Sequence, residues 1–204
     1  MKTEQDYLQD LTEIRTMMEK SSKFISLSGW AGYMAGIYSL AAFGIAFSYF
    51  HTDLTIRSNA QLTLSPSIFV LGIAGILLIL AVVTAIFLSR WEAKKRKETI
   101  WSPASKHLII HMAIPLISGG ILSLILLWYD QLVLLPAITL IFYGLALFNA
   151  AFFTNREVRI FGISQIVLGL MAAFFQQFAL LFWLAGFSFL HIIYGMSIQI
   201  IYKR

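Results

Sequence analysis

Between two long apolar runs stands SRWEAKKRKETIWSPASKHLIIH, residues 89–111. Its Lys and Arg residues number six between Ser89 and Lys106. Short loops of a membrane protein that carry an excess of Lys and Arg stay on the cytoplasmic side. We therefore predict that the apolar runs before and after this stretch both span a membrane, and that the stretch itself lies on the cytoplasmic side.

The composition of the chain is that of a membrane protein. Of its 204 residues, 59% are hydrophobic and 12% are charged, against about 25% charged in a soluble domain, and the mean hydropathy is +0.79. A helix needs about 20 mostly apolar residues to span a bilayer. We predict an all-α integral membrane protein, a bundle of six transmembrane helices with these spans: 24–50, 67–88, 106–128, 132–153, 160–175 and 178–201.

The links between the spans predict how neighbouring helices pair. Residues 129–131 and 176–177 are turns too short for anything but antiparallel neighbours, so we expect three consecutive hairpins within a transmembrane domain of residues 24–204. In the link after the first span, Leu54–Ile56 and Leu62–Leu64 alternate apolar residues with Thr. That alternation is compatible with a small β-hairpin.

The basic residues predict the topology. With both ends of the chain in the cytoplasm, 14 of the 15 Lys and Arg residues lie on the cytoplasmic side and only Arg57 lies outside, as the positive-inside rule requires. We expect the plasma (inner) membrane. The pI near 9.5 reflects residues that flank spans, so the expected partner is the lipid bilayer and not nucleic acid.

Residues 1–23 predict a cytoplasmic amphipathic helix, because Leu11, Ile14 and Met18 recur at helical spacing. Its polar face is acidic, whereas a helix lying on a membrane presents Lys and Arg. We therefore expect it to contact protein: the basic stretch of its own chain, a second copy in a homodimer, or another protein partner. The predicted interaction surface consists of Leu11, Ile14, Met18, Arg90, Lys94, Lys95, Arg96 and Lys97.

Small residues line one face of the first span. Gly29, Gly32, Gly36 and Ser39 follow one another at three- and four-residue spacing, a pattern that lets two helix backbones approach closely. Two interpretations are open: the face packs against another helix of the same bundle, or it forms a dimer interface.

No Asp, Glu, Lys or Arg needs to be placed inside a span, which argues against a pump or a proton-coupled transporter. The neutral polar residues instead gather near the cytoplasmic ends of the spans, with His191 deeper in the last one. They predict a polar vestibule, or else hydrogen bonds between packed helices. The candidate ligand or pore residues are His111, Asn149, Gln165, His191 and Gln199.

No catalytic motif is found, so we do not expect an enzyme, a metal site or a cofactor. His107 and His111 have the spacing of a metal-binding pair but have no third ligand nearby. His191 followed by Gly195 superficially resembles the last core helix of the rhomboid proteases. The fourth span, which carries the nucleophile in that family, contains no serine.

Two functions from different classes fit these features. The first is a passive channel or facilitator for a small neutral or amphipathic solute, with the polar residues lining its path. The alternative is a non-transporting regulatory or interaction protein that acts through its N-terminal helix and basic stretch.

Overall fold

The computed structural model describes residues 29–56, 65–96 and 103–202. The predicted helix of residues 1–23, with Leu11, Ile14 and Met18, lies outside the described residues, as does Lys97. In the described ranges the regular structure is entirely helical, and six helical segments are long and apolar enough to cross a membrane. The expected all-α class and the number of candidate spans are thereby confirmed.

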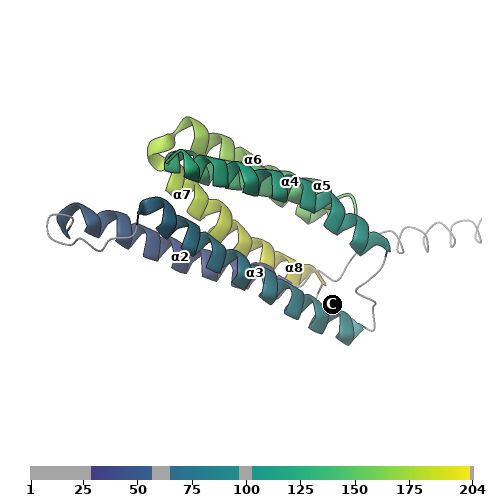
Figure 1. Cartoon of the computed structure of the whole chain (residues 1–204). Helices are drawn as coiled ribbons and strands as arrows, with labels where there is room; N and C mark the ends of the chain where they lie inside the picture. Colours follow the sequence, from purple (N-terminus) through teal and green to yellow (C-terminus); the bar gives the residue numbers. More distant parts are fainter. Residues whose placement is uncertain (1–28, 57–64, 97–102, 203–204) are drawn as a thin grey trace, which may run out of the picture.

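The helices form two layers (Figure 1). One contains α2, α3 and α8, the other contains α4, α5 and α6, and the last span runs diagonally from the second layer to the first. This last span is continuous through a π-helix, η3. The bounds are α2 Gly29–Ile56, α3 Pro66–Arg96, α4 Pro103–Trp128, α5 Leu135–Ala150, α6 Arg156–Phe174, α7 Ala179–Leu184, η3 Ala185–Leu190 and α8 His191–Tyr202.

The α5–α6 pair is the most tightly packed part of the bundle. A Cβ atom on Gly144 would lie 2.7 Å from the carbonyl oxygen of Gly162, and one on Gly162 would lie 2.9 Å from the carbonyl oxygen of Gly144. Only glycine allows backbones to come this close. Next to this crossing, Leu140 and Ala172 are completely buried and belong to the core shared with α7.

The small-residue face of α2 packs against α8 of the same chain. A Cβ atom on Gly29 would lie 2.6 Å from the carbonyl oxygen of Gly195, and one on Gly195 would lie 2.6 Å from the carbonyl oxygen of Gly29. A Cβ atom on Gly36 would lie 2.6 Å from Ile192 Cγ1 and 2.9 Å from the carbonyl oxygen of Ser188. Of the two interpretations of this face, packing within the bundle is confirmed.

α3 is peripheral. None of the most apolar window of its span is buried, and it packs mainly along α2, where Tyr49 stacks on Phe69 with ring centroids 3.7 Å apart. At its first turn, the Ser67 hydroxyl donates to Asp130 Oδ1 at 2.6 Å, which ties α3 to the turn between α4 and α5. A soluble protein rarely exposes so continuous an apolar surface.

Two local expectations are wrong. Leu54–Ile56, interpreted as one strand of a small β-hairpin, belongs to α2, because an existing helix elongates at little cost and three alternating residues are a weak strand signal. The other interpreted strand, Leu62–Leu64, lies outside the described residues. Arg90, Lys94 and Lys95, expected in a loop, lie on the last turns of α3. Lys, Arg, Glu and Ala are strong helix formers, so the helix continues beyond its apolar run.

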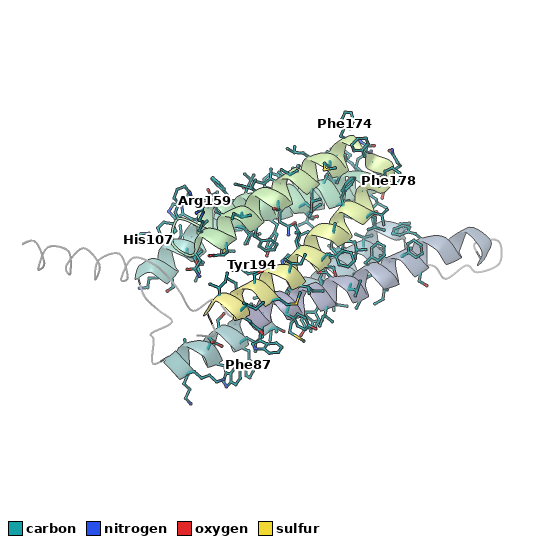
Figure 2. All side chains as sticks on the ribbon, turned by 180° about the vertical axis from the view of Figure 1, so that it is seen from behind. Phe87, His107, Arg159, Phe174, Phe178 and Tyr194 are labelled. Atoms are coloured by element: carbon teal, nitrogen blue, oxygen red, sulfur yellow. The ribbon has the colours of Figure 1, made fainter. Side chains whose placement is uncertain are left out.

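The two ends of the bundle differ in character. The end of α3, the start of α4 and the end of α8 lie at one end (Figure 1). Figure 2 places His107 and Arg159 at that end and Phe174 and Phe178 at the opposite one. The basic segments of the described chain therefore gather at a single end of the bundle.

Candidate functional site: a buried polar junction

Side chains from three spans meet around the π-helix of the last span. Tyr143 comes from α5, Gln165 from α6, and Ser188 and His191 from the last span itself. Gln165 and Ser188 are completely buried and His191 is 4% exposed. A π-turn is uncommon and often marks a functional position in a helix, so this junction is the first candidate for a site.

Both ring nitrogens of His191 are hydrogen-bonded. The Nδ1 atom lies 3.0 Å from the carbonyl oxygen of Gly186, and the Nε2 atom lies 2.9 Å from the Tyr143 hydroxyl. Because a carbonyl oxygen only accepts, Nδ1 carries the hydrogen and donates it. In the neutral ring Nε2 then accepts from the Tyr143 hydroxyl, so the contacts assign one tautomer to His191.

Gln165 shares the acceptor used by His191. Its Nε2 atom donates to the carbonyl oxygen of Gly186 at 2.9 Å, and that oxygen therefore receives two side-chain hydrogen bonds. The Oε1 atom of Gln165 is buried without a hydrogen-bond partner. A Cβ atom on Gly186 would lie 2.5 Å from this Oε1 and 2.4 Å from Leu140 Cδ2, so only glycine fits between the amide and the core.

Ser188 connects the junction to α2. Its hydroxyl donates to the carbonyl oxygen of Gly36 at 3.0 Å. Gly36 is buried at the α2–α8 crossing. The π-helix therefore holds α2 through Ser188, and α5 and α6 through His191 and Gly186.

Aromatic rings surround the imidazole of His191. Phe161 meets it edge-on with ring centroids 4.8 Å apart, and Phe187 stacks on it at 5.7 Å. Tyr194 stacks in turn on Phe161 at 4.8 Å. In such an apolar shell an unpaired polar atom is costly, which is why the hydrogen bonds of His191 matter for the stability of the bundle.

The junction is equipped to hold helices together. The Asp, Glu, Lys and Arg residues of the described chain lie outside the hydrogen-bonded set, which consists of neutral groups and backbone carbonyls. A neutral, buried chain of donors and acceptors fixes the relative positions of α2, α5, α6 and the last span.

The structure brings together two of the five candidate ligand or pore residues, Gln165 and His191. His111 is exposed on α4, with its ring centroid 5.0 Å from that of Phe153. Asn149 is half-buried near the end of α5. Gln199 is half-buried on α8, where its Cγ atom would lie 3.1 Å from a Cβ atom on Gly29.

Three participants in the junction were not among the sequence-based candidates: Tyr143, Gly186 and Ser188. An imidazole this deep in an apolar span needs hydrogen-bond partners, and those of His191 are the Gly186 carbonyl group and the Tyr143 hydroxyl. A signal for Tyr143 was available, because a tyrosine in the middle of an apolar span also needs a partner for its hydroxyl group.

The basic part of the predicted interaction surface is exposed. Arg90, Lys94 and Lys95 all reach solvent on the last turns of α3, and Lys95 Nζ lies 3.4 Å from the ring centroid of Trp91. Arg96 ends the helix, and its side chain lies outside the described part of the chain.

In comparisons with protein-family models, curated proteins and solved structures, nothing matches this chain.

Proposed function

We propose that the protein is a multi-pass integral protein of the plasma (inner) membrane, with six transmembrane helices in successive hairpins and both ends of the chain in the cytoplasm. Six apolar helices and the exposed apolar surface of α3 support the embedding. The distribution of Lys and Arg supports the orientation. Lipid then covers the apolar side chains that the bundle leaves exposed.

The orientation can be tested by cysteine labelling without background from native cysteines, because the chain contains none. Single cysteines replace Lys106 or Arg156 on the proposed cytoplasmic side, or Trp128 or Gln131 on the opposite side. We expect a membrane-impermeant maleimide added to intact cells to label only the second pair. Labelling of Lys106→Cys in intact cells would overturn the orientation.

Within the membrane, we propose that the protein acts as a non-transporting regulatory or interaction protein. The observation that carries this proposal is the state of Gln165 and His191, the two deepest polar candidates. Gln165 of α6 donates to the Gly186 carbonyl group, and His191 is bonded both to that carbonyl group within the last span and to the Tyr143 hydroxyl of α5, in an aromatic shell. Side chains that hold the bundle closed are not available to line a path for a solute.

A flux assay tests this proposal directly. The purified protein is reconstituted into liposomes, and the shrinkage and reswelling of the vesicles in glycerol or urea is followed by stopped-flow light scattering. We expect vesicles that contain the protein to have the same permeability as protein-free vesicles for both solutes. Entry of either solute at a rate that rises with the protein content, and that falls in a His191→Phe variant, would refute the non-transporting function.

The proposed working surface combines the basic end of α3 with residues 1–23. Its charges are complementary, because Asp6, Asp10 and Glu13 would share one face of the helix predicted from the sequence, while Arg90 and Lys94 are basic. We expect a disulfide between cysteines placed at Asp10 and Lys94, within one chain or between two copies. Cysteines at Asp10 and Trp128, on opposite sides of the proposed membrane, are the control pair. Equal cross-linking of both pairs, or none in either, would contradict this surface.

One observation favours the second candidate, a passive facilitator. The π-helix begins at Ala185 and ends next to His191, and such segments recur at functional positions. Under this proposal the π-helix is the point at which the last span rearranges to open a path. The same flux assay decides between the two functions.

A further inference from the structure

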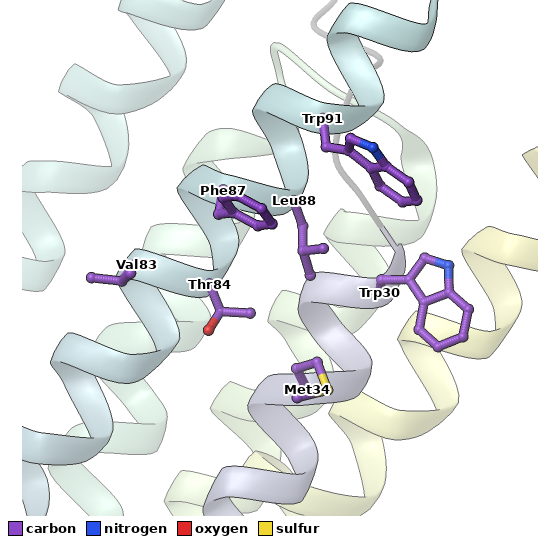
Figure 3. A pocket seen from close by; sticks show the side chains of 7 residues that line it. All are labelled: Trp30, Met34, Val83, Thr84, Phe87, Leu88 and Trp91. Carbon is purple, nitrogen blue, oxygen red and sulfur yellow. The ribbon is translucent and has the colours of Figure 1, made fainter.

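A pocket of about 480 Å³ lies between α2 and α3 (Figure 3). Trp30 and Met34 of α2 line one side, and Leu88 and Trp91 of α3 line the other. The lining is almost entirely apolar. It is separate from the polar junction, since it involves neither the π-helix nor His191.

A hydrogen bond between α2 and α3 marks one end of the pocket. Along α2, Trp30 and Met34 are followed after one more turn by Tyr38, whose hydroxyl lies 3.2 Å from Thr84 Oγ1. Thr84 also lines the pocket. From Thr84 to Trp91 the helix rises about 10 Å, at 1.5 Å per residue. The pocket is therefore a short apolar slot that runs from the Tyr38–Thr84 hydrogen bond to two indoles at its open end.

The open end of the slot is positively charged. Lys95 lies on the same face of α3 as Thr84, Leu88 and Trp91, one turn beyond Trp91. Its ammonium group lies over the Trp91 ring, 3.4 Å from the ring centroid, in a cation–π contact. Lys94 and Arg90 are exposed on the same turns. The only acid in α3 is Glu92, which is half-buried and has an interaction of its own.

The size of the slot distinguishes between apolar occupants. A helix about 10–12 Å in diameter fills roughly 500 Å³ per turn, so the pocket holds about one turn of a second copy or of another protein. An acyl chain is thin enough to enter the slot lengthwise. An acyl chain that bears an anionic headgroup also matches the lysines at the open end.

We propose that this pocket is a site for an anionic phospholipid of the cytoplasmic leaflet. One acyl chain lies between Met34 and Leu88, with its end toward the Tyr38–Thr84 hydrogen bond. The phosphate lies at the rim, within reach of Lys94, Lys95 and the two indole N–H groups. The site rests on the membrane embedding proposed above and does not depend on whether the protein transports a solute.

Lipid binding to the purified chain tests the headgroup. Delipidated protein in a neutral detergent is titrated with phosphatidylglycerol, and separately with phosphatidylcholine of the same acyl chains, and bound lipid is counted by native mass spectrometry. We expect one phosphatidylglycerol to bind in preference. A basic residue near a lipid headgroup contributes about 1 kcal/mol, so K94Q/K95Q should weaken phosphatidylglycerol binding about 30-fold and leave phosphatidylcholine binding unchanged.

The matched control removes the same charge elsewhere. K106Q/R156Q takes two exposed cations from the starts of α4 and α6, away from the pocket, and should leave the affinity unchanged. If it weakens binding as much as K94Q/K95Q, the lipid responds to net charge and the site is refuted. Equal binding of the two lipids to the unmodified protein also refutes it.

Filling the slot tests the acyl chain. Leu88 is half-buried and lines the pocket, so Leu88→Trp should abolish binding of the single tight lipid. Leu78→Trp makes the same change on α3 at a side chain that is 64% exposed and outside the pocket, and it should have no effect. Persistent tight lipid binding in Leu88→Trp would overturn the assignment. It would also be overturned if the lipid-free protein formed a dimer that Leu88→Trp disrupts, because a second copy would then occupy the slot.

The outcomes separate this proposal from the embedding. If cysteine labelling shows that the chain is not embedded, the membrane proposal itself fails, whatever lipid binds in detergent. If the chain is embedded as proposed and no phosphatidylglycerol binds tightly, only the lipid site fails.

Discussion

The hydrogen bond between Tyr143 and His191 should be one of the strongest single couplings between spans of this protein. Tyr143→Phe removes the hydroxyl group that donates to His191 Nε2 at 2.9 Å. It leaves a buried acceptor without a partner, at a cost of about 1–3 kcal/mol of unfolding free energy. His191→Leu removes the same bond, the bond to the Gly186 carbonyl group and the contact with Phe161, and should cost about 2–4 kcal/mol.

The double variant isolates the bond. With both partners gone, neither leaves the other unpaired, so Tyr143→Phe/His191→Leu should be about 1–2 kcal/mol more stable than the sum of the single effects predicts. Measured couplings between membrane helices average about 0.6 kcal/mol and reach about 1.7. We place this pair in the upper part of that range because His191 is 4% exposed and surrounded by aromatic rings.

Reversible unfolding in mixed micelles, titrated with a denaturing detergent, measures the four free energies of this cycle. The Tyr38–Thr84 pair is the internal control, because its hydroxyl groups are 3.2 Å apart and only part-buried. Tyr38→Phe and Thr84→Val should couple by less than about 0.5 kcal/mol. A Tyr143–His191 coupling no larger than that of the control pair would refute the argument that this bond is a buried link between α5 and the last span.

Three further predictions concern the junction and use the same unfolding assay. Gly186→Ala should destabilise the protein by about 1–3 kcal/mol, because its Cβ atom would lie 2.4 Å from Leu140 Cδ2. The control is Gly120→Ala on α4, where no atom lies within 4 Å of the added Cβ, and it should be neutral or slightly stabilising. Equal losses of stability in the two variants would contradict the packing argument. Ser188→Ala should cost about 1 kcal/mol of stability, because it removes the hydrogen bond to the Gly36 carbonyl group. Ser197→Ala should cost almost nothing, because the Ser197 hydroxyl bonds within its own helix. A larger loss of stability in Ser197→Ala than in Ser188→Ala would be inconsistent with a link to α2. Gln165→Met should change stability by less than about 1 kcal/mol. It removes the unpartnered Oε1 atom, and His191 still donates to the Gly186 carbonyl group. A loss of several kcal/mol would contradict the absence of a hydrogen-bond partner for Gln165 Oε1.

The class of the protein and most of its helices follow from the sequence alone. Length and hydropathy predict the apolar helices, because no other secondary structure satisfies all its backbone hydrogen bonds within a single apolar segment. The close packing of Gly29 and Gly36 was likewise predictable, since a face of small residues has no other structural use in an apolar helix. For the same kind of reason, the position of His191 indicated that it must have a hydrogen-bond partner.

The tertiary structure alone decided which groups meet. Apart from the small-residue face of α2, nothing in the sequence of the six apolar helices distinguishes a face that packs against protein from one that does not, because both kinds of face are apolar. Only the fold shows that the last span packs on α2, and that Tyr143 and the Gly186 carbonyl group are the partners of His191. The π-helix that presents Gly186 has no local signature, because its hydrogen bonds differ by one residue from those of an α-helix. The sequence therefore left open whether the neutral polar residues line a vestibule or bond between helices, and the packing of the helices determined which of them meet in the junction.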